Sequence, residues 1–81
     1  MKATLLSTNG NKSEIELTSF SHAQSLVNGL VEIIHLDDAY LLINEEGLIA
    51  NLPTNPFVPQ LKGDILIVNS KLFNKLPYNN V

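Results

Sequence analysis

The fold is decided by residues 26–55, which read LVNGLVEIIHLDDAYLLINEEGLIANLPTN and hold the densest apolar runs of the 81-residue chain. Residues 30–36 are rich in β-branched side chains and too few for an independent core helix. We interpret them as a strand that is buried on both faces, or nearly so, at the centre of a sheet. Asp37 and Asp38 favour a turn, and residues 40–43 then form the returning strand. A connection this short allows only an antiparallel hairpin.

The second turn of this stretch covers residues 44–47 and ends in Gly47. A type I turn followed by a glycine with positive φ is the natural geometry for it. We expect residues 48–50 to return as a third, short strand, so that the stretch forms a three-strand meander.

A separate hairpin is expected at the start of the chain, with strands in residues 1–8 and 13–18 and a turn at residues 9–11. A two-residue loop would set Leu5 opposite Glu14, whereas a three-residue loop sets Leu5 opposite Ile15. The second register collects apolar side chains on one face, and a slip of one residue would move them to the other. We therefore favour the loop of odd length.

Residues 19–28 predict a short helix that packs on one face of the sheet. Its start can be capped by Thr18 or Ser19, with Ser21 as the first residue of a second capping-box option. Gly29 is expected to end it in the left-handed conformation.

Residues 52–64 hold three of the four prolines, which excludes a central strand there. The segment is either one short helical turn that begins at Asn55 and Pro56 or an extended loop. Residues 64–68 predict a final buried strand, and a last short helix is expected before Pro77, with residues 76–81 as a frayed tail. The chain thus predicts a single α+β domain over residues 1–81, with about five mostly antiparallel strands and one helix on one face.

The order of these pieces resembles a small family of phages and plasmids, domain of unknown function 3846. The resemblance covers residues 26–69 and rests on the helix, LVNGLVEIIHL, the hairpin, NEEG, LPTNP and GDILIV, in that order. Leu30 stands where the family pattern has an aromatic residue, and residues 56–59 are richer in proline than the pattern. The resemblance implies an accessory protein of a mobile element, and it implies no activity.

Composition excludes several classes of function. The chain has no cysteine, so disulfides and thiolate metal sites are excluded. Its net charge is −3, and all five basic residues are lysines, which disfavours binding to nucleic acid. No segment has the roughly 18 to 20 apolar residues of a membrane span, and the start does not resemble a signal peptide. We expect a cytoplasmic, soluble protein. Charged residues make up only 16% of the chain, so exposed apolar surface and a homo-oligomer are expected.

The candidate site is the surface around the second turn. Adjacent carboxylates at a turn can bind a hard cation or act in acid–base chemistry, but solvated turn residues are the simpler interpretation. A buried asparagine amide can hold a loop through backbone groups or recognise a ligand, and we favour the structural role. Glu32 and His35 alternate onto opposite faces of their strand, and His22 and His35 lack the short spacing of a metal site. No catalytic residue, metal ligand or cofactor is assigned. The candidate residues are Asn44, Glu45, Glu46, Gly47, Pro53 and Asn55.

Two hypotheses of function follow from this sequence. The first is a non-catalytic accessory protein of a phage or other mobile element, which acts by protein–protein contact or by self-association. The alternative is a protein that binds a small, nucleotide-like ligand between subunits, near Glu45, Gly47, Pro53 and Asn55. The absence of arginine argues against tight capture of phosphate. A hydrolase or transferase ranks third, because nothing supplies a nucleophile beside a positioned base.

Overall fold

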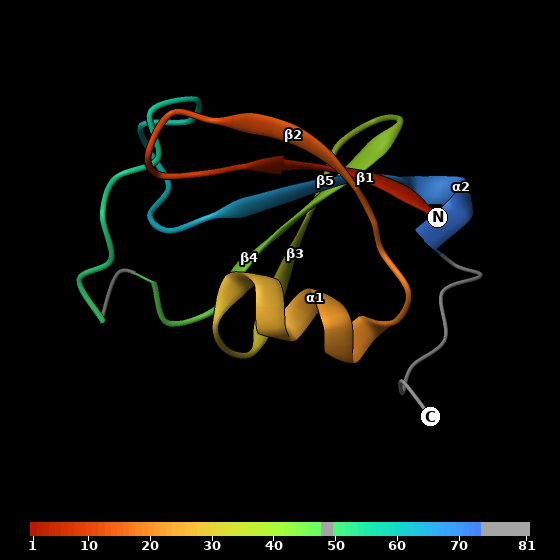
Figure 1. Ribbon diagram of the computed structural model, residues 1–81, viewed down its shortest axis with the longest axis horizontal. Coiled ribbons are helices and arrows are strands. Elements are labelled where there is room, and N and C mark those ends of the chain that lie inside the picture. The colour runs from red at the N-terminus through yellow and green to blue at the C-terminus, as the bar shows by residue number, and fades with distance from the viewer. Residues whose placement is uncertain (48–49, 74–81) are drawn as a thin grey trace.

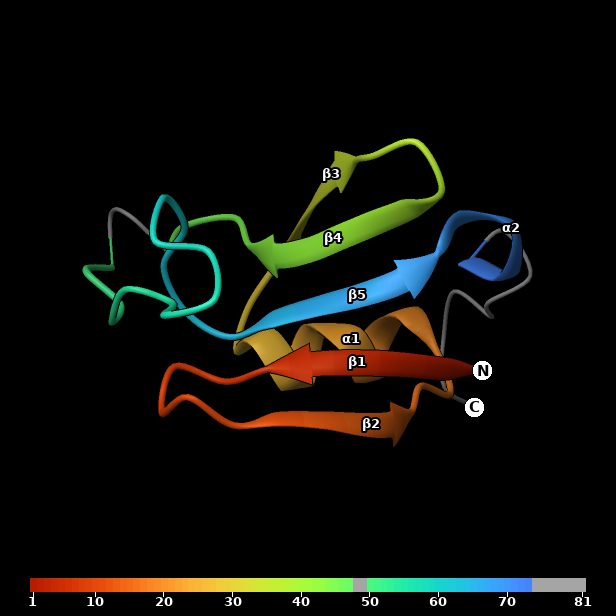
Figure 2. The ribbon, with the colours of Figure 1, turned by 90° about the horizontal axis from the view of Figure 1, so that it is seen from above.

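One antiparallel sheet of five strands organises the protein, in the order β2-β1-β5-β4-β3 (Figures 1 and 2). The computed structural model describes residues 1–47 and 50–73. The expected α+β fold is confirmed, with every neighbouring pair of strands antiparallel. Within these residues, two helices, α1 (Phe20–Val27) and the single turn α2 (Ser70–Phe73), accompany the strands. The strands are β1 (Lys2–Leu6), β2 (Lys12–Glu16), β3 (Val31–His35), β4 (Ala39–Asn44) and β5 (Ile65–Asn69).

The centre of the sheet lies elsewhere than the sequence predicts. β3 and β4 do form the expected hairpin, but β3 is an edge strand, and β5 lies at the centre between β1 and β4. The apolar character of residues 30–36 does not indicate a central position, because β4 and β5 each carry three buried residues while every residue of β3 is at least partly exposed. The expected meander is also wrong, since β5 takes the second edge of β4. Residues 48–49 lie outside the described part of the chain, and Ala50 lies in a turn.

The first hairpin has the predicted odd-length loop but a different register. Leu5 pairs with Ser13, and Ala3 pairs with Ile15, so the expected pairing of Leu5 with Ile15 is wrong. The loop consists of residues 8–10: Ser7 accepts a hydrogen bond from Gly10 N at 3.0 Å and donates one to Asn11 O at 2.9 Å. Gly10 has φ +91°, and a left-handed glycine belongs at the third position of such a loop. The loop therefore starts one residue earlier than expected, and each pairing shifts by two residues.

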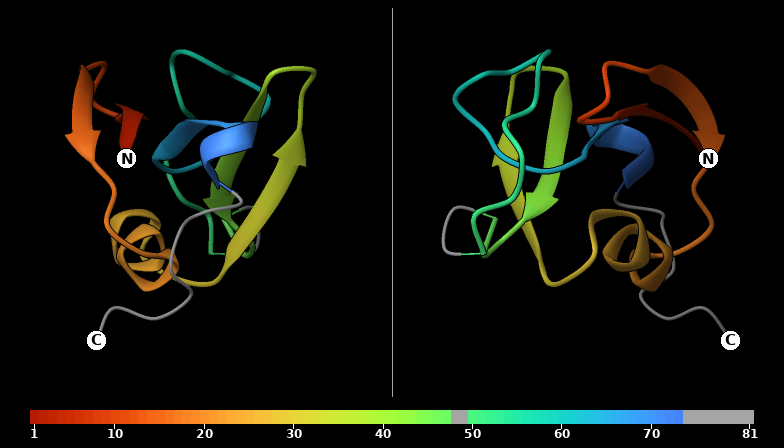
Figure 3. Two further views of the ribbon diagram at one scale, coloured as in Figure 1. Left: turned by 90° about the vertical axis from the view of Figure 1, so that its right-hand side faces the viewer. Right: turned by 60° about the vertical axis from the view of Figure 1, so that its left-hand side comes forward.

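The sheet has a different cover on each face. α1 packs beneath it, and the sheet twists so that β2 and β3 stand on either side of the helix (Figure 3). The core between them contains Leu17, Ala23, Val27, Leu42 and Leu66, all nearly or fully buried. On the opposite face, Val58 and Leu61 of the segment between β4 and β5 pack on Leu6, Leu41, Ile43 and Ile65. That segment forms bends and turns in place of the helical turn considered above.

Local signals position α1 between the two hairpins. Ser19 is the N-cap, and its buried hydroxyl accepts a hydrogen bond from His22 N at 3.0 Å. At the other end, Asn28 takes the left-handed conformation with φ 63°, so the expectation for Gly29 is wrong. Asparagine tolerates this conformation better than most residues, and Gly29 N completes the helix end by donating to Gln24 O.

Candidate functional site

Asn44, at the end of β4, ties three segments together. Its Nδ2 donates to Val27 O at 2.9 Å and to Asn28 O at 3.2 Å, at the end of α1. Its Oδ1 accepts from Glu46 N at 2.8 Å and so shapes the following turn. All three bonds go to the backbone, which is the structural role favoured from the sequence. Gly29 approaches so closely that a Cβ there would lie 2.8 Å from Asn44 Nδ2.

Asn55 anchors the proline segment to the sheet. It is fully buried, and its Nδ2 donates to Leu6 O of β1 and to Gly63 O, each at 2.9 Å. Its Oδ1 accepts from Phe57 N, also at 2.9 Å. Both amide protons and the amide oxygen are thus engaged, so Asn55 has no free group that points toward a ligand.

The other candidate residues lie near one another but differ in exposure and in structural role. Glu45 and Glu46 are exposed at the turn, Pro53 is exposed, and Gly47 is buried. Gly47 does not adopt the expected positive φ, since the described glycines that do are Gly10 and Gly63. Its small size matters for another reason. A Cβ at Gly47 would lie 3.0 Å from Lys62 O, so glycine lets the turn after β4 approach the strand-like segment before β5.

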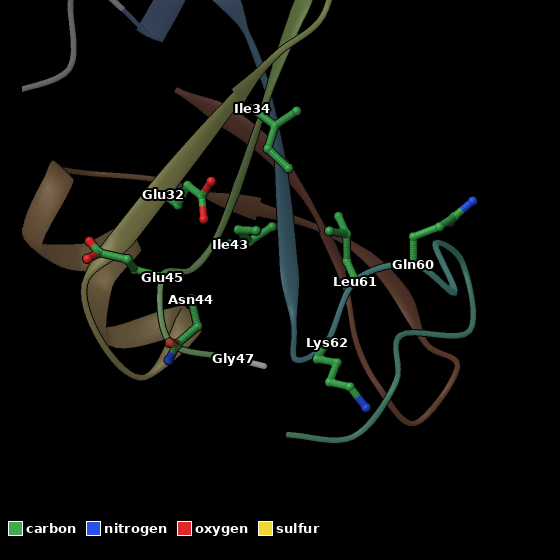
Figure 4. Close-up of a pocket in the computed structure, with 9 residues that line it drawn as sticks. All are labelled: Glu32, Ile34, Ile43, Asn44, Glu45, Gly47, Gln60, Leu61 and Lys62. Atoms are coloured by element: carbon green, nitrogen blue, oxygen red, sulfur yellow. The ribbon is translucent and has the colours of Figure 1, made fainter. Parts of the chain in front are cut away.

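A pocket lies beside this close approach, on the face of the sheet opposite α1 (Figure 4). Its volume is about 220 Å³. Ile34, Ile43 and Leu61 form its apolar part, and the carboxylate of Glu32 turns toward it while that of Glu45 points away (Figure 4). The pocket brings together Asn44, Glu45 and Gly47 of the predicted site. Glu46, Pro53 and Asn55 do not line it, whereas Glu32, Gln60 and Lys62 do.

The outer edge of β3 is the second candidate. Glu45 N donates to Leu30 O, and Leu36 N donates to Ala39 O, both at 2.8 Å. Backbone groups alternate in direction along an antiparallel strand, so the even-numbered residues of this strand bond β4. Val31, Ile33 and His35 therefore direct their N–H and C=O groups away from the sheet. Within residues 1–47 and 50–73, no strand pairs with that edge.

The two edges of the sheet differ in how they are protected. Natural sheets block their edges with charges, prolines or bulges. β2 carries Lys12, Glu14 and Glu16, all exposed. β3 carries Glu32 and His35 but no lysine, proline or bulge, and a leucine stands at each end of it. Leu30 is 60% exposed and Leu36 is 50% exposed. The edge of β3 thus combines unpaired backbone groups with exposed apolar side chains.

Sequence reasoning missed this edge because it placed residues 30–36 at the centre of the sheet. The available signal was negative: residues 12–16 carry three charges that mark one edge, and no second charged strand marks the other.

The structure also brings no group of three or more histidine, aspartate or glutamate side chains together as a metal site among the described residues. In the same part of the chain, no helix is long and apolar enough to cross a membrane.

Comparison with models of protein families identifies a match. The model of the family described as Domain of unknown function (DUF3846) matches residues 1–80, nearly the whole chain. No curated protein and no solved structure matches.

Proposed function

Because the chain belongs to the DUF3846 family, whose description assigns no activity, we propose its function from the site: it is a non-catalytic interaction protein that binds another polypeptide by adding a strand to β3. The single observation that carries this proposal is the outer edge of β3, where no strand of residues 1–47 and 50–73 pairs and where three residues direct backbone groups outward. Strand addition uses such groups for affinity, and flanking side chains for specificity.

The surroundings of the edge support an extended segment as the bound element. Val31 and Ile33 lie on the α1 side of the sheet and Ile34 on the opposite side, so an added strand would extend both apolar faces. Leu30 and Leu36 would be covered at its two ends. The setting in a phage or other mobile element is part of this proposal and rests on the resemblance described above.

The test removes a single outward N–H group. His35→Pro deletes the N–H that faces away from β4, and proline is tolerated at such edge positions. It also removes the His35 ring, whose centroid lies 4.5 Å from that of Tyr40, so His35→Ala is the control that loses the ring but keeps the N–H. Glu14→Pro is the matched control at the other edge, because pairing of Leu17 N with Met1 O directs the even-numbered residues of β2 outward.

Association is read as native mass of the purified protein and as proteins retained from host lysate. We expect His35→Pro to lose association, while His35→Ala and Glu14→Pro keep it, with all three variants folded by circular dichroism. Equal association of a folded His35→Pro variant would show that the β3 edge is not the docking surface. A wild-type protein that stays monomeric and retains nothing would also end the proposal.

The pocket supports a second proposal, the binding of a small ligand. Its apolar part and the inward carboxylate of Glu32 favour a ligand with a positively charged group over a nucleotide. Among the described residues that line the pocket, Lys62 is the one cationic residue. A thermal-shift panel of small amines and nucleotides tests this, because a specific ligand stabilises the folded state by mass action. A shift with nucleotides alone would reverse the charge argument, and no shift at all would end the ligand proposal.

A further inference from the structure

We infer that the strand added to β3 is the β3 of a second copy of this chain, antiparallel and related by a two-fold axis at Ile33. This inference rests on the proposed function and names its partner. A two-fold interface joins the same patch on both subunits. The edge must therefore be complementary to itself, and its backbone and side-chain patterns can be compared register by register.

The backbone pattern is symmetric about Ile33. Val31, Ile33 and His35 direct their N–H and C=O groups outward. With the axis at Ile33, each of the three faces an outward residue of the second copy: Ile33 faces Ile33, and Val31 faces His35. Each facing pair exchanges two bonds, which gives about six hydrogen bonds. If the axis is moved by one residue, to Glu32 or to Ile34, only two of the three outward residues of each copy still face one another. The third then lies opposite a residue outside β3.

The side-chain pattern selects the same register. With the axis at Ile33, Leu30 of one copy lies opposite Leu36 of the other, so the two exposed leucines cover each other. Glu32 then faces Ile34 rather than a second carboxylate. An axis at Glu32 would instead place the two Glu32 carboxylates directly opposite, and like charges at facing positions are destabilising. The register centred on Ile33 is thus the one that satisfies backbone, leucines and charge together.

The size of the contact predicts its strength. Stable protein interfaces bury about 1,200–2,000 Å² in total, and one five-residue strand with its two flanking leucines is a small edge by that standard. We therefore expect a dimer whose population rises with protein concentration. Because Glu32 also lines the pocket, the interface would run along the β3 wall of each pocket.

The absence of cysteine from the chain makes disulfide trapping a clean test. In this register Leu30 and Leu36 of the second copy form a non-hydrogen-bonded pair, for which the Cα atoms lie about 4.5 Å apart. That separation is within the range a disulfide can bridge. Two Leu30 positions, by contrast, would lie six residues apart along the strand, or about 20 Å. Both leucines are exposed, so cysteine at either site should leave the fold intact.

A mixture of Leu30→Cys and Leu36→Cys proteins should therefore cross-link under mild oxidation into a heterodimer of twice the 8.9 kDa chain mass. Leu30→Cys alone should give little dimer. Leu72 is 43% exposed on α2, so Leu72→Cys mixed with Leu30→Cys is the matched control and should also give little. An independent test without oxidation mixes Leu30→Glu/Leu36→Glu with Leu30→Lys/Leu36→Lys. Each variant alone should be monomeric, and the mixture should restore the dimer.

The outcomes separate this inference from the function it rests on. Leu30→Cys that cross-links with itself as well as with Leu36→Cys would overturn the register. A monomer at every concentration, with no cross-link in the mixture, would overturn the second copy as partner. If wild type still retained a host protein and His35→Pro did not, strand addition at β3 would stand with a different partner. If His35→Pro retained it too, both proposals would fall.

Discussion

Replacement of Asn55 by alanine tests whether one side chain holds the proline segment on the sheet. The variant leaves Leu6 O, Gly63 O and Phe57 N without their present partner. A buried backbone group without a partner costs about 1–3 kcal/mol. The bonds to Leu6 O and Gly63 O are fully buried, whereas the bond to Phe57 N is only partly buried and water can replace it. Counting the two carbonyls alone, at about 1–3 kcal/mol each, we expect a loss of about 2–6 kcal/mol in the free energy of unfolding.

For a domain of this size, such a loss lowers the melting temperature by at least about 8 °C. Urea unfolding followed by circular dichroism measures it directly. Asn55→Asp has nearly the same volume but faces an oxygen toward both carbonyls, so its loss should be at least as large. Asn11→Ala, at an exposed asparagine, is the control and should change stability by less than about 0.5 kcal/mol. A loss below about 1 kcal/mol for Asn55→Ala would refute the anchoring role.

Three further predictions concern other local contacts. Ser19→Ala removes the α1 N-cap and should cost about 1 kcal/mol in urea unfolding; a neutral result would contradict the cap. Asn44→Ala frees the end of α1 and should cost about 1–3 kcal/mol, with exchange of the α1 amides as the local readout. The Met1 ammonium, 2.6 Å from Glu16, lowers the Glu16 pKa by its hydrogen bond and then by its charge. That stabilisation is present above the unfolded pKa and is lost as the pH falls through the folded value. An NMR titration should find the lowered pKa, and Glu16→Gln should remove this part of the acid dependence.

The local elements could be predicted from the sequence because their signals are local. The Asp37-Asp38 turn, the Ser19 cap and the final strand each follow from a few adjacent residues and their backbone preferences. That strand was expected at residues 64–68 and lies at Ile65–Asn69. The position of strands in the sheet depends instead on long-range pairing. The run at residues 30–36 is apolar, but its two end leucines are exposed. Apolar composition alone does not distinguish a central strand from an edge strand.

The candidate site shows the same division. Asn44 and Asn55 could be singled out from the sequence, yet which backbone groups they bind depends on β1, α1 and β5 coming together. Gly47 was expected to provide a positive φ, and it provides a close approach to Lys62 O instead. Glu32 and Lys62 join the pocket from segments thirty residues apart, and no short motif links two such positions.

The position of β5 between β1 and β4 has a consequence for synthesis of the chain on the ribosome. Both hairpins precede β5 in the chain, and among the described strands β5 is the one that pairs with a strand of each. Until β5 leaves the exit tunnel, the nascent chain exposes edges of β1 and β4 whose backbone groups have no strand partner. We therefore expect truncated chains that lack β5 to expose these unpaired edges and to be prone to aggregation or degradation.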